Sequence, residues 1–177
     1  MIRSRPRMVS VLLVLVTVIT YLALVFGPLR VLVALTEGLW PPDLHLLGLH
    51  YADFLIWHAA LGGEGVDLLH GLMMWHEGAF ILSLGLTLAW FFRPQPGSGW
   101  QGANWLGLGL TLAWILCDIV ENLLVRGLAR SNSFHISPET VTFLSSVTRG
   151  KFAALAGASL VLLWALYRSR MTRALSG

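Results

Sequence analysis

Four stretches of this 177-residue chain are long and apolar enough to cross a lipid bilayer, and they constrain the fold more than any other feature. A transmembrane helix needs about 20 mostly apolar residues to cross a hydrocarbon core about 30 Å thick. The four stretches are residues 8–26, 72–92, 105–125 and 148–167. They predict an all-α fold, in which residues 1–177 form one membrane domain. That domain is a polytopic membrane protein built as a four-transmembrane-helix bundle.

The composition excludes several other classes of protein. Hydrophobic residues make up 56% of the chain and charged residues 12%, whereas a soluble globular chain carries about 25% charged residues. The net charge of +3 is small, and its basic residues gather beside apolar stretches rather than on a phosphate-binding surface. A soluble globular enzyme, a disordered tail and a nucleic-acid-binding module are therefore excluded. We expect the lipid bilayer as a partner and no nucleic acid.

The first stretch follows a basic N-terminus, as the hydrophobic region of a cleaved signal peptide does. Its apolar run is longer than the about 7–15 residues of that region, and no small-x-small cleavage site follows it. We therefore expect a retained helix that ends at Gly27-Pro28. The second, third and fourth spans are expected to end at residues 93–97, at Arg126 and at Arg168.

The basic residues near the ends of the spans predict the orientation, because cytoplasmic loops carry an excess of Lys and Arg. Four crossings place one group of arginines on a single side, and this side should be the cytoplasm: Arg3, Arg5, Arg7, Arg93, Arg168, Arg170 and Arg173. A smaller group falls on the opposite, outer side: Arg30, Arg126, Arg130, Arg149 and Lys151. Both termini are therefore predicted to be cytoplasmic.

Residues 36–71 connect the first two spans and are too polar for a further crossing. Pro41-Pro42-Asp43 is typical of a helix start, and Gly62-Gly63 is typical of a helix stop. The leucine-rich segment near these signals also carries His45, His50, Asp53 and His58. We expect an additional amphipathic helix that lies in the outer membrane interface. A second start signal, Ser137-Pro138-Glu139, predicts that the fourth helix begins near Pro138.

Polar residues of the predicted spans fall at one depth. With a rise of about 1.5 Å per residue, Tyr21, Glu77, Asp118, Glu121 and Lys151 each lie about 20–24 Å from the cytoplasmic end of their span. Spacings of three and four place neighbouring polar residues on the same helix faces. The resulting predicted buried polar cluster consists of Glu77, Asp118, Glu121, Asn122, Thr148 and Lys151.

The charges of this cluster do not balance. Three carboxylates face one intramembrane cation, Lys151, while Arg126 and Arg149 reach it only by snorkelling from the interface. Uncompensated ionised carboxylates are expensive in a membrane, so they are candidates for function by default. Three interpretations stay open: a structural ion pair between two helices, a ligand, metal or proton site, and a helix phase that turns some acids toward an outer aqueous cleft.

Histidine and carboxylate side chains suggest one candidate metal or cofactor site, at His70, His76 and Glu77. His76 alone is also a candidate axial ligand of a pigment. No motif specifies a cofactor, which stays unknown: His-Glu-x-x-His, Gly-x-Ser-x-Gly and a Walker-type phosphate loop are absent. The single cysteine, Cys117, excludes a quinone-linked disulfide enzyme.

Three short motifs resemble those of a widespread, uncharacterised family of small bacterial four-helix membrane proteins. They are Leu61-Gly62-Gly63-Glu64-Gly65 before the second span, Asp118-Ile119-Val120-Glu121-Asn122 in the third, and Ser145-x-x-Thr148-x-x-Lys151 with Phe152 next in the fourth. The resemblance implies that the Asp118, Glu121, Asn122 and Lys151 cluster is the signature of that family. It also implies the bacterial cytoplasmic (inner) membrane, and it supplies no reaction.

The sequence favours a non-enzymatic function, either an accessory or assembly subunit or a small binding module. Such a protein has other membrane subunits, or copies of itself, as expected partners. Two alternatives stay open. One is an intramembrane enzyme or proton- or solute-coupled protein that uses Glu77, Asp118, Glu121 and Lys151, and the other is a metal- or pigment-binding protein that uses His76.

Overall fold

The computed structural model describes residues 5–93 and 101–175, which form helices and connecting segments without a strand. The α-helices are α1 (Arg5–Leu24), α2 (Arg30–Leu35), α3 (Tyr51–Leu68), α4 (Met74–Phe91), α5 (Gln101–Ala129) and α6 (Pro138–Leu175). Two π-helical segments, η1 (Val25–Leu29) and η3 (Leu69–Met73), join neighbouring α-helices, and two short 3-10 turns are η2 (Pro42–Leu44) and η4 (Ser133–His135). Arg3 and the expected boundary at residues 94–97 lie outside the described residues.

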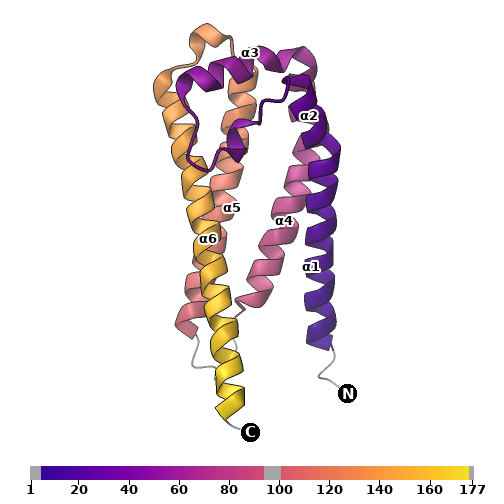
Figure 1. Ribbon diagram of the computed structural model, residues 1–177, viewed down its shortest axis with the longest axis vertical. Helices are drawn as coiled ribbons and strands as arrows, with labels where there is room; N and C mark the ends of the chain where they lie inside the picture. Colours follow the sequence, from indigo (N-terminus) through magenta and orange to yellow (C-terminus); the bar gives the residue numbers. More distant parts are fainter. Residues whose placement is uncertain (1–4, 94–100, 176–177) are drawn as a thin grey trace.

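Four continuous helical stretches are long and apolar enough to cross a membrane: Met8–Leu35, Tyr51–Phe91, Gln101–Ala129 and Pro138–Arg168. The predicted all-α bundle with four candidate membrane spans is therefore confirmed. Figure 1 shows the long helices running along the molecule, with α3 across one end, which we call the α3 end. The start of α1 and the end of α6 both lie at the opposite end (Figure 1).

The sequence predicts that the first span ends at Gly27-Pro28. In the structure the helical stretch continues past these residues. Gly27 leaves the helical conformation (φ −95°, ψ −113°), and Pro28 provides no backbone N–H. The chain accommodates both residues in η1 and continues as α2 to Leu35. The expected helix stop is therefore wrong, because these two residues kink the helix instead of ending it.

The expected additional helix between the first two spans is present, as α3, but it begins later than predicted. Pro42–Leu44 form only a 3-10 turn, and the α-helix starts at Tyr51. Phe54, Trp57 and Leu61 form its buried face. Gly62 then turns the chain with φ 59° and ψ −178°, after which helical structure resumes and leads through η3 into α4. The predicted stop at Gly62-Gly63 is thus a sharp bend that turns α3 into the second span.

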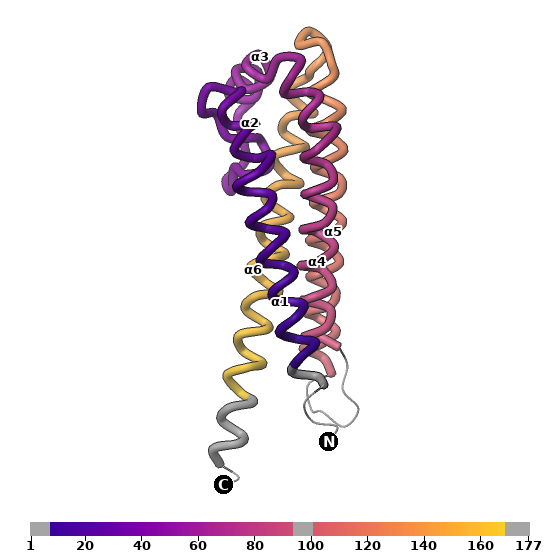
Figure 2. The backbone as a smooth tube through the Cα atoms, turned by 90° about the vertical axis from the view of Figure 1, so that its right-hand side faces the viewer, coloured from indigo at the N-terminus to yellow at the C-terminus, as the bar shows by residue number. Residues whose placement is uncertain are grey.

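The spans are arranged as two packed pairs, α1 with α4 and α5 with α6, and α4 also contacts α5. Polar side chains join the first pair, because Thr17 Oγ1 lies 2.8 Å from Thr87 Oγ1 and Thr20 Oγ1 lies 2.8 Å from Ser83 Oγ. In the second pair, small residues of α6 allow close approach, because a Cβ added at Gly157 would lie 3.2 Å from the Leu110 side chain of α5 and Ala158 is fully buried. Figure 2 shows α6 diverging from α4 and α5 toward its C-terminal end.

The largest apolar core lies at the α3 end. It joins the buried face of α3 to residues of α2, α5 and α6, among them Leu32, Val125 and Leu144. A smaller core around Leu88, Phe92 and Ala158 lies farther along the bundle. The fourth helix begins at Pro138, as predicted, where Ser137 Oγ accepts a hydrogen bond from the Thr140 backbone N–H at 3.3 Å.

Candidate functional site

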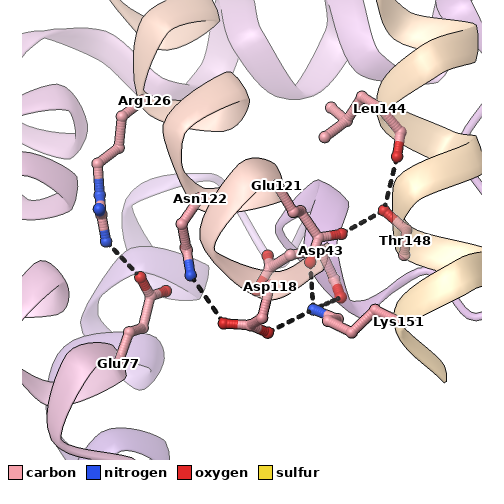
Figure 3. A network of polar contacts seen from close by, with 9 residues as sticks. All are labelled: Asp43, Glu77, Asp118, Glu121, Asn122, Arg126, Leu144, Thr148 and Lys151. Carbon is pink, nitrogen blue, oxygen red and sulfur yellow. Dashed lines mark hydrogen bonds and ion pairs between the residues drawn. The ribbon is translucent and has the colours of Figure 1, made fainter. Parts of the chain in front are cut away.

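Glu121 of α5 is the most deeply buried charged residue among those described, with none of its surface exposed. The Thr148 hydroxyl donates a hydrogen bond to Glu121 Oε1, and the Lys151 ammonium forms an ion pair with Glu121 Oε2. Both partners belong to α6 and lie three residues apart. A single carboxylate therefore fixes the register of α6 against α5 (Figure 3).

Lys151 gathers three acceptors around its ammonium group. Besides Glu121, it lies 3.2 Å from Asp118 Oδ1 and 3.2 Å from the backbone carbonyl oxygen of Asp43. The Asn122 amide donates to Asp118 Oδ2 at 3.0 Å, so both oxygens of that carboxylate are engaged. Because an ammonium has three N–H groups, these contacts match its full donor capacity.

Glu77 forms a separate ion pair. Its Oε2 lies 2.7 Å from a terminal guanidinium nitrogen of Arg126, which joins α4 to α5. Only 10% of the Glu77 side chain and 15% of the Arg126 side chain is exposed. Arg149 takes no part in these three ion pairs, and its Nε donates to the Ser145 backbone carbonyl at 3.2 Å.

The residues of the predicted cluster therefore lie together, buried or half-buried, but they form two separate groups of contacts, and one further residue joins them. Asp118, Glu121, Asn122, Thr148 and Lys151 form a connected network, whereas Glu77 reaches Arg126. The addition is Asp43, whose backbone contacts Lys151 (Figure 3). Sequence reasoning treated this residue only as a helix cap, and no signal in its own neighbourhood points toward residue 151.

The motifs of α5 and α6 face each other in the fold, whereas the motif at residues 61–65 lies at the bend between α3 and α4. Ser145 Oγ donates to the Leu49 backbone carbonyl at 2.8 Å and accepts from the Leu49 N–H at 2.9 Å, which ties the connecting segment to α6. Thr148 and Lys151 then hold the acids of α5. Gly62 supplies the bend between α3 and α4. Ser145 and Lys151 of the α6 motif together hold residues 43–49 beside the polar network.

A cavity of about 380 Å³ lies beside this network. Its polar end is formed by Asp43, Glu77, Asp118, Asn122 and Lys151. Its apolar and aromatic wall is contributed by α1, η1, η3, α4, α5 and α6 and by residues 40 and 44: Tyr21, Leu24, Val25, Leu29, Trp40, Leu44, Met73, Phe80, Ile81, Trp114, Phe152 and Leu155. The volume is near the lower end of the range of about 300–1,000 Å³ that is usual for small-molecule sites.

The mouth of the cavity is marked by lining residues that are also exposed. Tyr21 is 49% exposed, Trp40 is 56% exposed and Leu44 is 38% exposed, whereas Trp114 at the inner wall is 3% exposed. A larger depression of about 620 Å³ at the α3 end is lined by polar and small residues, including His58 and Arg130, and none of the ion-paired residues contributes to it. The smaller cavity is therefore the one that joins buried charge to apolar walls.

The candidate metal site at His70, His76 and Glu77 is not assembled by these side chains. His70 Nδ1 lies 2.9 Å from the Val66 carbonyl and His76 Nδ1 lies 2.8 Å from the Leu72 carbonyl, each one turn back on its own helix. No group of three or more His, Cys, Asp or Glu side chains in residues 5–93 and 101–175 is placed to hold a metal ion. His70 lies in the π-helical segment η3, which changes the helix rotation between His70 and Glu77. In a regular helix these two residues, seven apart, would share one face.

The fold and site together define a helical membrane protein with a buried ionic network beside an amphiphilic cavity. No family model, no curated protein and no solved structure matches this chain. The resemblance to the bacterial four-helix family consequently stays a prediction from the motifs alone.

Proposed function

We propose that this protein is a small membrane-embedded binding module whose ligand, an amphiphilic molecule of the bilayer, occupies the cavity between α1 and α6. The observation that carries the proposal is the division of the cavity wall. Charged and amide groups gather at one end, and aliphatic and aromatic side chains line the remainder. An amphiphile places its polar group and its chain in the same two environments.

The position of the mouth supports entry from the lipid. Tyr21 belongs to a membrane span, and the exposed rings of Tyr21 and Trp40 suit the boundary between headgroups and hydrocarbon. The helices on either side, α1 and α6, pack mainly on α4 and α5 rather than on each other. A ligand chain that extends from the cavity would therefore pass between α1 and α6 into the surrounding bilayer.

Native mass spectrometry of the full chain, purified in a mild non-ionic detergent, tests the proposal. We expect a bound amphiphile that survives removal of the detergent. Leu24 lines the cavity, so Leu24→Trp should fill part of it and abolish the adduct. Leu22 on the same helix is exposed and does not line it, so Leu22→Trp should retain the adduct. Equal adducts on both variants, or none on the wild type, would overturn the proposal.

We further propose the bacterial cytoplasmic membrane as the location, with both termini in the cytoplasm. The support is the arginine distribution and the position of the start of α1 and the end of α6 at one end of the bundle (Figure 1). In a Cys117→Ser background, an impermeant maleimide added to intact cells should label Phe134→Cys, at a position that is 93% exposed at the α3 end. It should not label Gly177→Cys, and the reverse pattern would invert the topology.

The other interpretations from the sequence stay predictions. An accessory or assembly subunit would co-purify with a stoichiometric membrane partner, or would self-associate. An intramembrane enzyme or coupled transporter would lose its activity in both Glu77→Gln and Glu121→Gln while remaining folded. Metal or pigment binding at His76 would be detected by elemental analysis and by the absorption spectrum of the purified protein.

A further inference from the structure

Most of the charged groups at and next to the polar end of the cavity are already paired with one another. Both cations are engaged, Lys151 by three acceptors and Arg126 by Glu77. The carboxylates of Glu77, Asp118 and Glu121 each take part in an ion pair. With Asp43 included, four carboxylates stand beside two cations. The unmatched negative charge is therefore located at the cavity wall.

Asp43 is the residue that presents this charge to a ligand. Its backbone carbonyl is held by Lys151 at 3.2 Å, which fixes its place beside the network. Asp43 lines the cavity and is half-buried, and its carboxylate has no hydrogen bond or close ion pair among the described residues, although it does attract the neighbouring Lys151 ammonium. A carboxylate in this position interacts more strongly with a cation than it would in water, because the surrounding dielectric is lower.

Anionic, neutral and cationic head groups would interact differently with the charges at this site. An anionic group would have to displace a carboxylate from Lys151 or Arg126, and would then lie beside four negative charges. A neutral group would leave the excess of carboxylates over cations uncompensated. A cationic group would offset part of this excess at Asp43 without displacing any of the three existing ion pairs.

The aromatic lining is a second, independent feature that suits a cation. Five of the lining residues are aromatic: Tyr21, Trp40, Phe80, Trp114 and Phe152. The rings of Tyr21 and Phe80 lie 5.5 Å apart, measured between centroids, so two of these rings form a joint wall. Ring faces attract ammonium groups through their quadrupoles, and aromatic cages are a recurrent means of binding quaternary ammonium.

From these observations we infer that the cavity binds an amphiphile whose polar group is an ammonium, received by the Asp43 carboxylate and by aromatic rings of the cavity lining, with its alkyl chain along the apolar wall. This inference rests on the proposed function and names the class of its ligand. Long-chain amines and lipids with amine or choline head groups share this chemistry.

Titration calorimetry of the full chain in dodecyl maltoside micelles, with three probes of equal chain length, tests the charge preference. The probes are dodecyltrimethylammonium, dodecanol and dodecyl sulfate. We expect the ammonium probe to bind about tenfold more tightly than either of the others, a difference that corresponds to one ionic contact. The Leu24→Trp variant provides the background of partition into the micelle.

Asp43→Asn tests the assigned residue. It should weaken binding of the ammonium probe about tenfold and leave the dodecanol affinity unchanged, because only the charge is removed. Asp67→Asn is the matched control, since Asp67 is an exposed aspartate that lines a different depression. Should Asp43→Asn fail to fold, the order of the three probes on the wild-type chain still decides the question.

The outcomes separate this inference from the proposed function. Equal binding of all three probes, or tighter binding of dodecyl sulfate, would overturn the ammonium inference and leave the amphiphile module intact. Tight ammonium binding that Asp43→Asn does not change would overturn the role of Asp43. If no probe binds better to the wild type than to Leu24→Trp, the proposed function fails, and the inference fails with it.

Discussion

Glu121 of α5 and Lys151 of α6 form an ion pair in which none of the Glu121 side chain and only 7% of the Lys151 side chain is exposed. Such a pair contributes less to stability than its contacts imply, because both charges have lost their hydration. Breaking it by removing one partner is nevertheless costly, since the remaining charge is stranded. The pair therefore acts chiefly as a specificity device that sets how α6 lies on α5.

Replacement of Lys151 by methionine should destabilise the protein strongly. Asp118 and Glu121 would both lose their cation, and loss of one member of a buried pair costs about 3–5 kcal/mol. We expect a clear fall in the apparent melting temperature in detergent. The double variant Lys151→Met/Glu121→Met should recover part of the loss, because one stranded carboxylate is removed. A wild-type melting temperature for the single variant would show that the pair is not formed.

Thr148→Val tests the hydroxyl contact to the same carboxylate. The replacement preserves the shape and removes the donor to Glu121 Oε1, which should cost about 1–2 kcal/mol. Thr142→Val on the same helix is the control, because the exposed Thr142 hydroxyl bonds only to the Pro138 carbonyl. Unfolding by a denaturing detergent should separate the two variants, and equal stabilities would contradict the Glu121 contact.

The location of the network could be predicted from the sequence because it depends on regular helices. A constant rise per residue placed Asp118, Glu121 and Lys151 at one depth, and the helix period placed them on facing stripes. Both quantities are local, so they need no knowledge of tertiary structure. The ion pairs between α5 and α6 agree with this predicted depth and facing arrangement.

The features that sequence reasoning missed all depend on departures from regular helix. Asp43 reaches Lys151 from the 3-10 turn η2 in the connection before α3, whose path is set by tertiary contacts such as the Ser145–Leu49 hydrogen bonds. The phase of His70 depends on η3, because a π-helical segment inserts an extra residue into the turn. The first span continues past Pro28 because the η1 kink replaces the regular hydrogen-bond pattern. None of these has a sequence period to reveal it.

The bend between α3 and α4 should depend on Gly62. Its φ of 59° with ψ of −178° lies in a region that is open essentially only to glycine, so Gly62→Ala should cost about 1–3 kcal/mol. Gly63→Ala is the adjacent control, because it lacks a positive φ and its added Cβ would meet no atom within 4 Å. Thermal unfolding of the two variants checks the difference, and an equally stable Gly62→Ala would mean that the chain does not require this bend.

Close packing beside the smaller core around Phe92 should make the stability of the protein depend on the absence of a side chain at Gly107. A Cβ added there would overlap the ring of Phe92, which is buried, so Gly107→Ala should cost about 1–3 kcal/mol by overpacking. Gly109 on the same helix has open space at the Cβ position. Gly109→Ala should therefore be neutral or stabilising by about 0.5–1 kcal/mol. Melting temperatures in the reverse order would contradict the contact between α5 and Phe92.

The excess of carboxylates predicts an asymmetry between the two members of the Glu77–Arg126 pair. Replacing either residue with glutamine removes the same ion pair and one charge. Arg126→Gln strands Glu77, which is nine-tenths buried near Asp43 and Asp118, and it leaves four acids beside a single cation. Glu77→Gln instead reduces the mismatch, and the freed guanidinium can move toward the other acids.

We therefore expect Arg126→Gln to lose about 3–5 kcal/mol and Glu77→Gln to lose distinctly less, because only the first strands a buried charge among like charges. Parallel denaturation of the two variants in one detergent measures the difference directly. Asp118→Asn/Arg126→Gln should be more stable than Arg126→Gln alone, because removal of a second acid restores part of the balance. If Glu77→Gln proved the more damaging change, the negative charge at the cavity would not be in excess, and its preference for a cationic ligand would lose its electrostatic basis.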